Sequence, residues 1–72
     1  MNKPKYELYD EVRFVSGGEQ HIGTIEIVDR FGTFEQNVEP SYDIMVHNWR
    51  GSGQDMFYKH VVESLVLNKI SY

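Results

Sequence analysis

Three histidines are the side chains of this chain best suited to bind a metal ion or to carry a proton, and their spacing favours neither role. His21, His47 and His60 are separated by 26 and 13 residues, whereas metal-binding motifs usually place two ligands within a few residues of each other. A turn between strands could bring His47 near His60, with Asp43 or Asp55 as a third ligand. Ordinary surface histidines are far more common, so we expect no metal site and no cofactor.

Two glycine-rich segments have the composition, but not the spacing, of catalytic loops. In Gly51-Ser52-Gly53 the glycines flank the serine directly, whereas a nucleophile elbow has the pattern Gly-x-Ser-x-Gly between a strand and a helix. The segment SGGEQ, residues 16–20, has neither the spacing nor the lysine of a phosphate-binding loop. No carboxylate has a sequence context typical of a general acid or base. We therefore expect a protein that is not an enzyme.

Aromatic side chains in polar segments are the remaining candidates for a functional site. Phe31 and Phe34 lie in RFGTFEQN, and Trp49 precedes Arg50 in NWRGSG. Aromatic residues and arginine are the types that most often anchor protein interfaces. Trp49 lies between polar residues and a glycine-rich turn, so we expect its ring to be exposed. The two phenylalanines could contact a partner or cover the core, and Tyr9 could contact a partner or pack against the domain.

Length, charge and cysteine content limit the classes of function. A chain of 72 residues forms one domain with a small core. Its net charge of −4, with nine of the eleven acidic residues at or before Asp43, repels phosphate backbones, so nucleic-acid binding is possible but disfavoured. The absence of cysteine suits a reducing compartment. No apolar run has the length of a signal peptide or membrane span, so we expect a soluble cytoplasmic protein that does not act at a membrane.

Alternation of apolar and polar residues predicts a hairpin in the first half of the chain. In DEVRFV, Val12 and Phe14 share one face. In HIGTIEIVD, which is rich in β-branched residues, Gly23, Ile25 and Ile27 share one face. Gly23 in mid-strand indicates either a bulge or the close approach of another backbone.

The second half predicts three further strands. In YDIMVH, Tyr42, Ile44 and Val46 share one face and alternate with polar or flexible residues on the other. MFYKH, residues 56–60, predicts a short strand after the NWRGSG turn. The segment KHVVESLVLN is ambiguous, because a helix would align Val61 with Leu65. A single 3₁₀ turn near residues 60–62 followed by a last strand, ESLVL, leaves no strand unpaired. We favour the second interpretation because the segment is short, uncapped and β-branched.

The predicted fold is all-β: a small five-stranded barrel with one short 3₁₀ turn before the last strand. It forms one domain over residues 1–72, with an ordered core at about residues 8–68. The order of elements resembles that of SH3-like barrels over roughly residues 10–68. Residues 10–29, DEVRFVSGGEQHIGTIEIVD, are also similar to the KOW motif of ribosomal proteins and transcription elongation factors. The compact size further resembles small SH3-like proteins of bacteria and their phages.

The resemblance implies an interaction function, because KOW domains bind RNA or proteins. This chain carries Glu19, Gln20, Glu26 and Asp29 where an RNA-binding KOW domain would be expected to carry lysines. The resemblance also implies a ligand groove between the first loop and the loop that carries Phe31, which Tyr6 and Tyr9 could line.

We therefore expect a non-enzymatic interaction module that binds a protein partner, a basic one in particular. The candidate partner-binding residues are Tyr9, Phe31, Phe34, Trp49 and Arg50. The alternative is KOW-like binding of single-stranded RNA, in which aromatic rings stack on unpaired bases. Self-association through an edge strand or through Val61 and Val62 is a third hypothesis.

Overall fold

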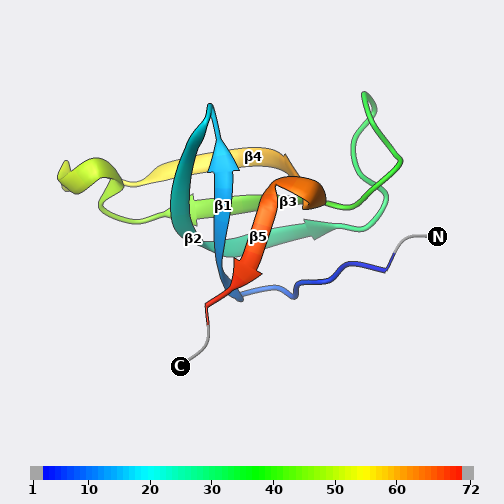
Figure 1. The fold of residues 1–72 in the computed structure, drawn as a ribbon, viewed down its shortest axis with the longest axis horizontal. Helices are drawn as coiled ribbons and strands as arrows, with labels where there is room; N and C mark the ends of the chain where they lie inside the picture. Colours follow the sequence, from blue (N-terminus) through cyan, green and yellow to red (C-terminus); the bar gives the residue numbers. More distant parts are fainter. Residues whose placement is uncertain (1–2, 71–72) are drawn as a thin grey trace.

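One antiparallel sheet of five strands makes up the fold in the computed structural model, which describes residues 3–70 (Figure 1). In chain order the strands are β1 (Glu11–Ser16), β2 (Glu19–Asp29), β3 (Ser41–Val46), β4 (Met56–Val62) and β5 (Val66–Lys69). They lie in the order β4-β3-β2-β1-β5, so β5 returns to pair with β1. The prediction of an all-β domain with five strands is confirmed.

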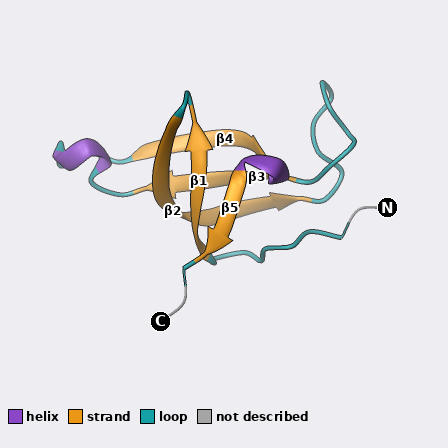
Figure 2. Ribbon diagram, in the orientation of Figure 1, coloured by secondary structure: helices purple, strands orange, loops and turns teal. Residues whose placement is uncertain are grey.

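Helical structure in the described residues is limited to two short 3₁₀ helices (Figure 2). The first, η1 (Trp49–Gly51), lies in the loop between β3 and β4, and the second, η2 (Glu63–Leu65), lies directly before β5. Between residues 3 and 70 there is no helix with the length and apolar character needed to span a membrane.

A two-residue turn joins β1 to β2. Gly17 and Gly18 have φ angles of 59° and 78°, and this left-handed pair matches the twist of the flanking strands. Gly23 lies between two strands, because β1 pairs with it on one side and β3 approaches it on the other. A Cβ atom at this residue would lie 2.6 Å from the carbonyl oxygen of Met45. Of the two explanations for Gly23, the close approach of a backbone is therefore right.

β2 changes partners along its length and is bulged where it does so. Its first half pairs with β1 and its second half with β3, and the register with β3 shifts between Ile25 and Ile27. The extra residue at the bulge reverses which side chains face the core. Ile25 is fully buried, whereas Ile27 is 50% exposed. The expectation that these two isoleucines share a buried face is therefore wrong.

The core draws apolar side chains from all five strands. Its buried members are Val12, Phe14, Ile25, Tyr42, Ile44, Val46, Val61 and Val66. Four half-buried residues pack against this cluster: Tyr6, Val28, Trp49 and Tyr58. The predicted inward faces of the first and third strands are confirmed by this set.

The last third of the chain follows the strand interpretation, shifted along the sequence. β4 continues through Val61, which is buried and pairs with Tyr42. The 3₁₀ turn expected at residues 60–62 therefore begins at Glu63, and the last strand follows it. Burial of Val61 is the physical reason for the shift, and the Glu63 N–H then donates to the carbonyl of Pro40 at 2.9 Å.

Tyr42 ties the core to η2 and to the N-terminal segment. Its hydroxyl donates to the Glu63 carboxylate at 2.7 Å, and the backbone N–H of Lys5 donates to the same carboxylate at 2.9 Å. The ring of Tyr6, which precedes the expected core of residues 8–68, packs edge-on against Tyr42 with centroids 5.9 Å apart. Burial raises the pKa of Tyr42 well above its usual range, and the hydrogen bond to Glu63 adds to the shift.

Candidate functional site

Residues 30–40 connect β2 to β3 and form a loop held by its own hydrogen bonds. The Asp29 carboxylate accepts the Phe31 N–H at 3.0 Å. The Thr33 hydroxyl accepts the N–H groups of Glu35 and Gln36, each at 3.2 Å. The Thr33 N–H in turn donates to the Gln36 carbonyl at 2.6 Å. Short polar side chains that bond to nearby backbone in this way fix the shape of a turn.

The interior of this loop is filled by polar groups and backbone. The Gln36 side-chain amide donates to the Glu39 carbonyl at 3.0 Å and accepts the Glu39 N–H at 3.3 Å. Gly32 is buried against these groups with φ of 76°, and a Cβ atom there would collide with the Gln36 carbonyl oxygen. A residue without a side chain is therefore required at this position.

Both phenylalanines of the loop face solvent. Phe31 is 61% exposed and Phe34 is fully exposed. Because polar groups fill the loop interior, neither ring covers the core. Of the two roles considered from the sequence, covering the core is therefore wrong for both phenylalanines. Large exposed aromatic rings on an otherwise polar segment are typical of interaction surfaces.

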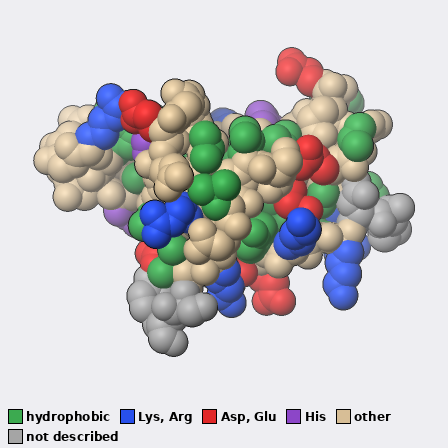
Figure 3. Space-filling view, in the orientation of Figure 1, with side chains coloured by type: hydrophobic (Ala, Val, Ile, Leu, Met, Phe, Trp, Pro, Cys, Tyr) green, Lys and Arg blue, Asp and Glu red, His purple; other side chains and the backbone are tan. Residues whose placement is uncertain are grey.

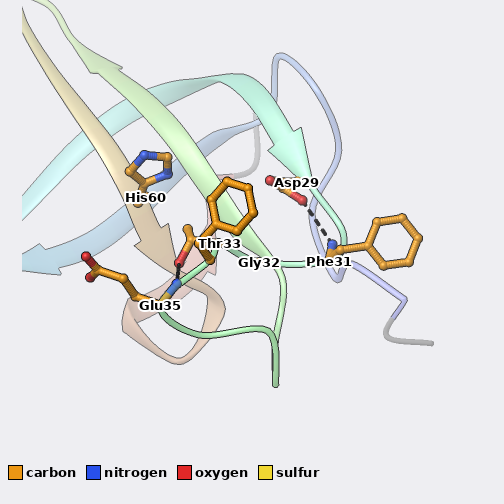
Figure 4. Close-up of a pocket in the computed structure, with 7 residues that line it drawn as sticks. Asp29, Phe31, Gly32, Thr33, Glu35 and His60 are labelled. Carbon is orange, nitrogen blue, oxygen red and sulfur yellow. Dashed lines mark hydrogen bonds between the residues drawn. The ribbon is translucent and has the colours of Figure 1, made fainter.

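An open pocket of about 540 Å³ lies between this loop and β4. The residues that line it are Asp29, Phe31, Gly32, Thr33, Phe34, Glu35 and His60. His60 and Glu35 lie on one side, and the Phe31 ring lies on the opposite side and points away from them (Figure 4). The pocket therefore combines aromatic rings with two carboxylates and an imidazole.

His60 reaches the pocket because β4 is bulged at this point. The register between β3 and β4 shifts between Tyr42 and Ile44, and His60 has a left-handed backbone with φ of 58°. Its N–H donates to the buried carboxylate of Asp43 at 3.0 Å. Positive φ at a residue other than glycine is strained and persists where the surroundings enforce it.

Sequence reasoning missed His60, which it treated as an ordinary surface histidine. One signal could have pointed to it. Asp43 interrupts an apolar central strand, and a buried carboxylate needs a donor from a neighbouring strand. That donor is the backbone N–H of His60.

The loop between β3 and β4 contradicts the expectation that Trp49 is exposed. The Trp49 ring is half-buried and packs against the core, and its indole N–H donates to the Tyr58 hydroxyl at 2.6 Å. Arg50 covers the ring from outside, with its guanidinium 4.4 Å from the ring centroid, and pairs with Glu19 at 2.6 Å. The short helix η1 turns the indole back toward the sheet, where its N–H finds an acceptor.

The hydrogen bond from Trp49 continues into an aromatic cluster. The Tyr58 hydroxyl lies 3.4 Å from the Nε2 atom of His21, and the Tyr58 ring meets Phe14 edge-on with centroids 5.2 Å apart. Phe14 belongs to the core. Trp49 is thus an extension of the core, whereas the other residues of NWRGSG, residues 48 and 50–53, are exposed.

Tyr9 is exposed, but it does not line the pocket beside the β2–β3 loop. Its backbone has φ of 72°, and its N–H donates to the Ile25 carbonyl at 2.8 Å. Of the five predicted partner-binding residues, the structure thus brings together Phe31 with Phe34 at the pocket and Trp49 with Arg50 in the β3–β4 loop, and Tyr9 lies with neither pair.

The histidines lie next to single carboxylates. His47 is 3.2 Å from Asp55, and the ring of His60 is 4.0 Å from Asp43. Within residues 3–70 there is no group of three or more His, Asp or Glu side chains arranged to hold a metal ion.

Comparisons with protein-family models, with curated proteins and with solved structures found no significant match to this chain.

Proposed function

We propose that the chain is a non-enzymatic interaction module, a small SH3-like barrel that binds a protein partner through its β2–β3 loop. The strand order and the 3₁₀ helix before the last strand support the resemblance to SH3-like barrels. The absence of cysteine suits the reducing cytoplasm, where we expect the module to act.

The exposure of Phe31 and Phe34 on an internally bonded loop carries this proposal. Aromatic rings contribute most of the binding energy at many protein interfaces. A loop already fixed by hydrogen bonds loses little conformational entropy when a partner binds, so more of the contact energy appears as affinity. The two rings therefore form a preorganised contact surface.

The charge of the chain favours a basic partner. The net charge is −4, and Asp29 and Glu35 line the pocket beside the two phenylalanines. Opposite charge on the partner accelerates association and disfavours acidic competitors.

Quantitative affinity capture with the whole chain tests this function. We expect the Phe31→Ala/Phe34→Ala double variant to capture at least about tenfold less partner than the unaltered chain, because two anchoring rings are removed. Leu67→Ala is the matched control, since Leu67 is also an exposed apolar residue but lies on β5. A partner that binds the double variant as well as the unaltered chain would contradict the proposal.

Single-stranded RNA is the second candidate ligand, because an exposed phenylalanine can stack on an unpaired base. On the face shown in Figure 3, however, Lys and Arg side chains lie apart from one another among acidic and apolar ones. Mixed-sequence single-stranded RNA should therefore leave the ¹⁵N amide signals of Phe31 and Phe34 unchanged at low salt. Shifts that reverse when salt is raised would favour the RNA function.

Self-association through Val61 is not part of the proposal. The side chain of Val61 is buried in the core and is not available to a second copy of the chain.

A further inference from the structure

The pocket between the β2–β3 loop and β4 has a composition that selects the chemistry of its ligand. Resting on the proposed protein-binding function, we propose that this pocket accepts an arginine side chain from a basic segment of the partner. The walls of the pocket combine exposed aromatic rings with two carboxylates, of which only one oxygen of Asp29 accepts a hydrogen bond from another described residue.

Phe34 supplies the stacking surface. Its side chain is fully exposed, so both faces of the ring are open to a ligand. The Phe31 ring points away from His60 and Glu35 (Figure 4), and Phe34 is the other aromatic residue that lines the pocket. A planar guanidinium stacks on an aromatic face and is attracted by its negative potential.

Glu35 supplies the charge that pairs with a cation. Its backbone N–H is bonded to Thr33, but its carboxylate has no hydrogen bond or ion pair with any other residue between 3 and 70. Asp29 uses one carboxylate oxygen for the Phe31 N–H and keeps the other free. The pocket therefore offers at least three carboxylate oxygens to a ligand.

No cationic side chain of the described residues lines the pocket to neutralise these carboxylates. Arg30 and Lys59 are neighbours in sequence of lining residues, yet neither is among the residues that form the walls. A ligand with positive charge is the electrostatic complement of such a pocket.

Arginine fits this arrangement better than lysine does. Its guanidinium can stack on Phe34 while donating two parallel hydrogen bonds to the Glu35 carboxylate. An ammonium group is compact and strongly hydrated, so it pairs with the carboxylate without the stacking contribution. The volume of about 540 Å³ also leaves room for the residues on either side of the arginine.

His60 forms the wall opposite Phe31, and its position is enforced. Its side chain is 65% exposed, so core packing does not explain why a histidine occupies a left-handed position where glycine would be relaxed. The bond from its N–H to Asp43 holds the residue there. Strain kept in this way at the rim of a pocket is typical of functional positions.

Amide spectra of the whole ¹⁵N-labelled chain test the proposal. The probes are three acetylated and amidated peptides, Gly-Gly-Xaa-Gly-Gly, in which Xaa is arginine, lysine or citrulline. Citrulline has the shape of arginine without its charge. We expect the arginine peptide to shift the amides of Thr33, Glu35 and His60 in a saturable way. The lysine peptide should bind about threefold or more weakly, and the citrulline peptide should give no saturable shift.

Variants locate the binding. Phe34→Ala and Glu35→Gln should each lower the affinity for the arginine peptide by about three- to tenfold, because each variant removes one of the two contacts. Glu26→Gln is the matched control, since Glu26 is an exposed carboxylate on β2 that does not line the pocket. Its affinity for the peptide should equal that of the unaltered chain.

Three results would overturn the proposal. The first is the absence of any shift with the arginine peptide up to about 20 mM, a concentration at which even a complex with a millimolar Kd would form. The second is binding of the citrulline peptide as tight as that of the arginine peptide. The third is an affinity of Glu35→Gln for the arginine peptide equal to that of the unaltered chain. If single-stranded RNA shifts these amides and the peptide does not, the pocket belongs to nucleic-acid binding. Should the peptide fail while partner capture still depends on Phe31 and Phe34, the arginine site is refuted and the interaction function stands.

Discussion

The two long loops of this domain extend from opposite ends of the sheet and treat their aromatic residues in opposite ways (Figure 1). The β2–β3 loop exposes Phe31 and Phe34, whereas the β3–β4 loop folds Trp49 back onto the core. Both segments are polar and contain glycine, so composition does not explain the difference.

The two loops expose or bury their aromatic rings according to which groups fill the interior of each loop. In the β2–β3 loop, Thr33 and Gln36 satisfy the backbone from inside and leave no space for a ring. In the β3–β4 loop, the Asn48 side chain accepts the Gly53 N–H at 2.7 Å, and the Trp49 ring packs against the core. An indole N–H buried without an acceptor is unfavourable, and Tyr58 supplies that acceptor.

Removing one aromatic ring from each loop gives the largest contrast. Trp49→Ala should lower the free energy of unfolding by about 3 kcal/mol, because the ring is half-buried and its loss opens a cavity. Phe34→Ala should change it by less than about 0.5 kcal/mol, since the ring contacts solvent. Urea unfolding followed by circular dichroism measures both without relying on tryptophan fluorescence. Equal losses of stability in the two variants would refute the distinction between the loops.

Adding one methyl group to each loop gives the next largest contrast. Gly32→Ala should lower the free energy of unfolding by about 2–3 kcal/mol, from left-handed strain together with overpacking. Gly51→Ala is the matched control, because Gly51 has a similar φ of 70° but open space around it. It should lose only about 1–2 kcal/mol, from strain alone. If the two variants unfold at the same urea concentration, the β2–β3 loop is not as tightly filled as its geometry indicates.

The parts of the fold that local pattern controls could be predicted from the sequence. Val12 and Phe14 face the core as their alternation predicts, and the glycine pair predicts the hairpin turn. The local pattern does not predict which face a side chain occupies where pairing with a neighbouring strand determines it. Ile27 turns outward because of a bulge against β3, and no alternation in β2 itself reveals that bulge.

The candidate site could be predicted only in part for the same reason. Phe31 and Phe34 were identified because they interrupt a polar segment. The partial burial of Trp49 depends on its hydrogen bond to Tyr58. The position of His60 depends on its hydrogen bond to Asp43 in another strand. Hydrogen-bond partners between strands are a property of register, which the sequence does not state directly.

Two tyrosine hydroxyls hold neighbouring segments to the core, and the pKa of one of them, Tyr42, is raised. Tyr42 donates to Glu63 in η2, directly after β4, whereas Tyr58 accepts from Trp49 in the β3–β4 loop. The raised pKa of Tyr42 means that the folded state keeps its proton when the unfolded chain loses it. The resulting stability is complete below the unfolded pKa of about 10 and is lost as pH rises above it.

Above pH 10, loss of the Tyr42 proton in the unfolded chain lowers the free energy of unfolding by at most about 1.4 kcal/mol per pH unit. Tyr42→Phe should remove that contribution, so its stability should fall less steeply with pH than that of the unaltered chain. Tyr58→Phe, the matched control, should retain the full dependence. Urea midpoints between pH 8 and pH 11 measure the slopes. Identical slopes for Tyr42→Phe and the unaltered chain would show that Tyr42 does not couple stability to pH.

The smallest effect on stability is expected at His60, where strain and binding can be separated. Glycine accepts φ of 58° without strain but adds freedom to the unfolded chain, so His60→Gly should change the free energy of unfolding by less than about 1 kcal/mol. The same variant removes one wall of the pocket and should lower the affinity for the arginine peptide. A matched substitution at another left-handed position, Asn48→Gly in the β3–β4 loop, should leave peptide binding unchanged. If His60→Gly lowered stability strongly, the histidine would belong to the fold rather than to the site, and the strain at this bulge would have a structural cause.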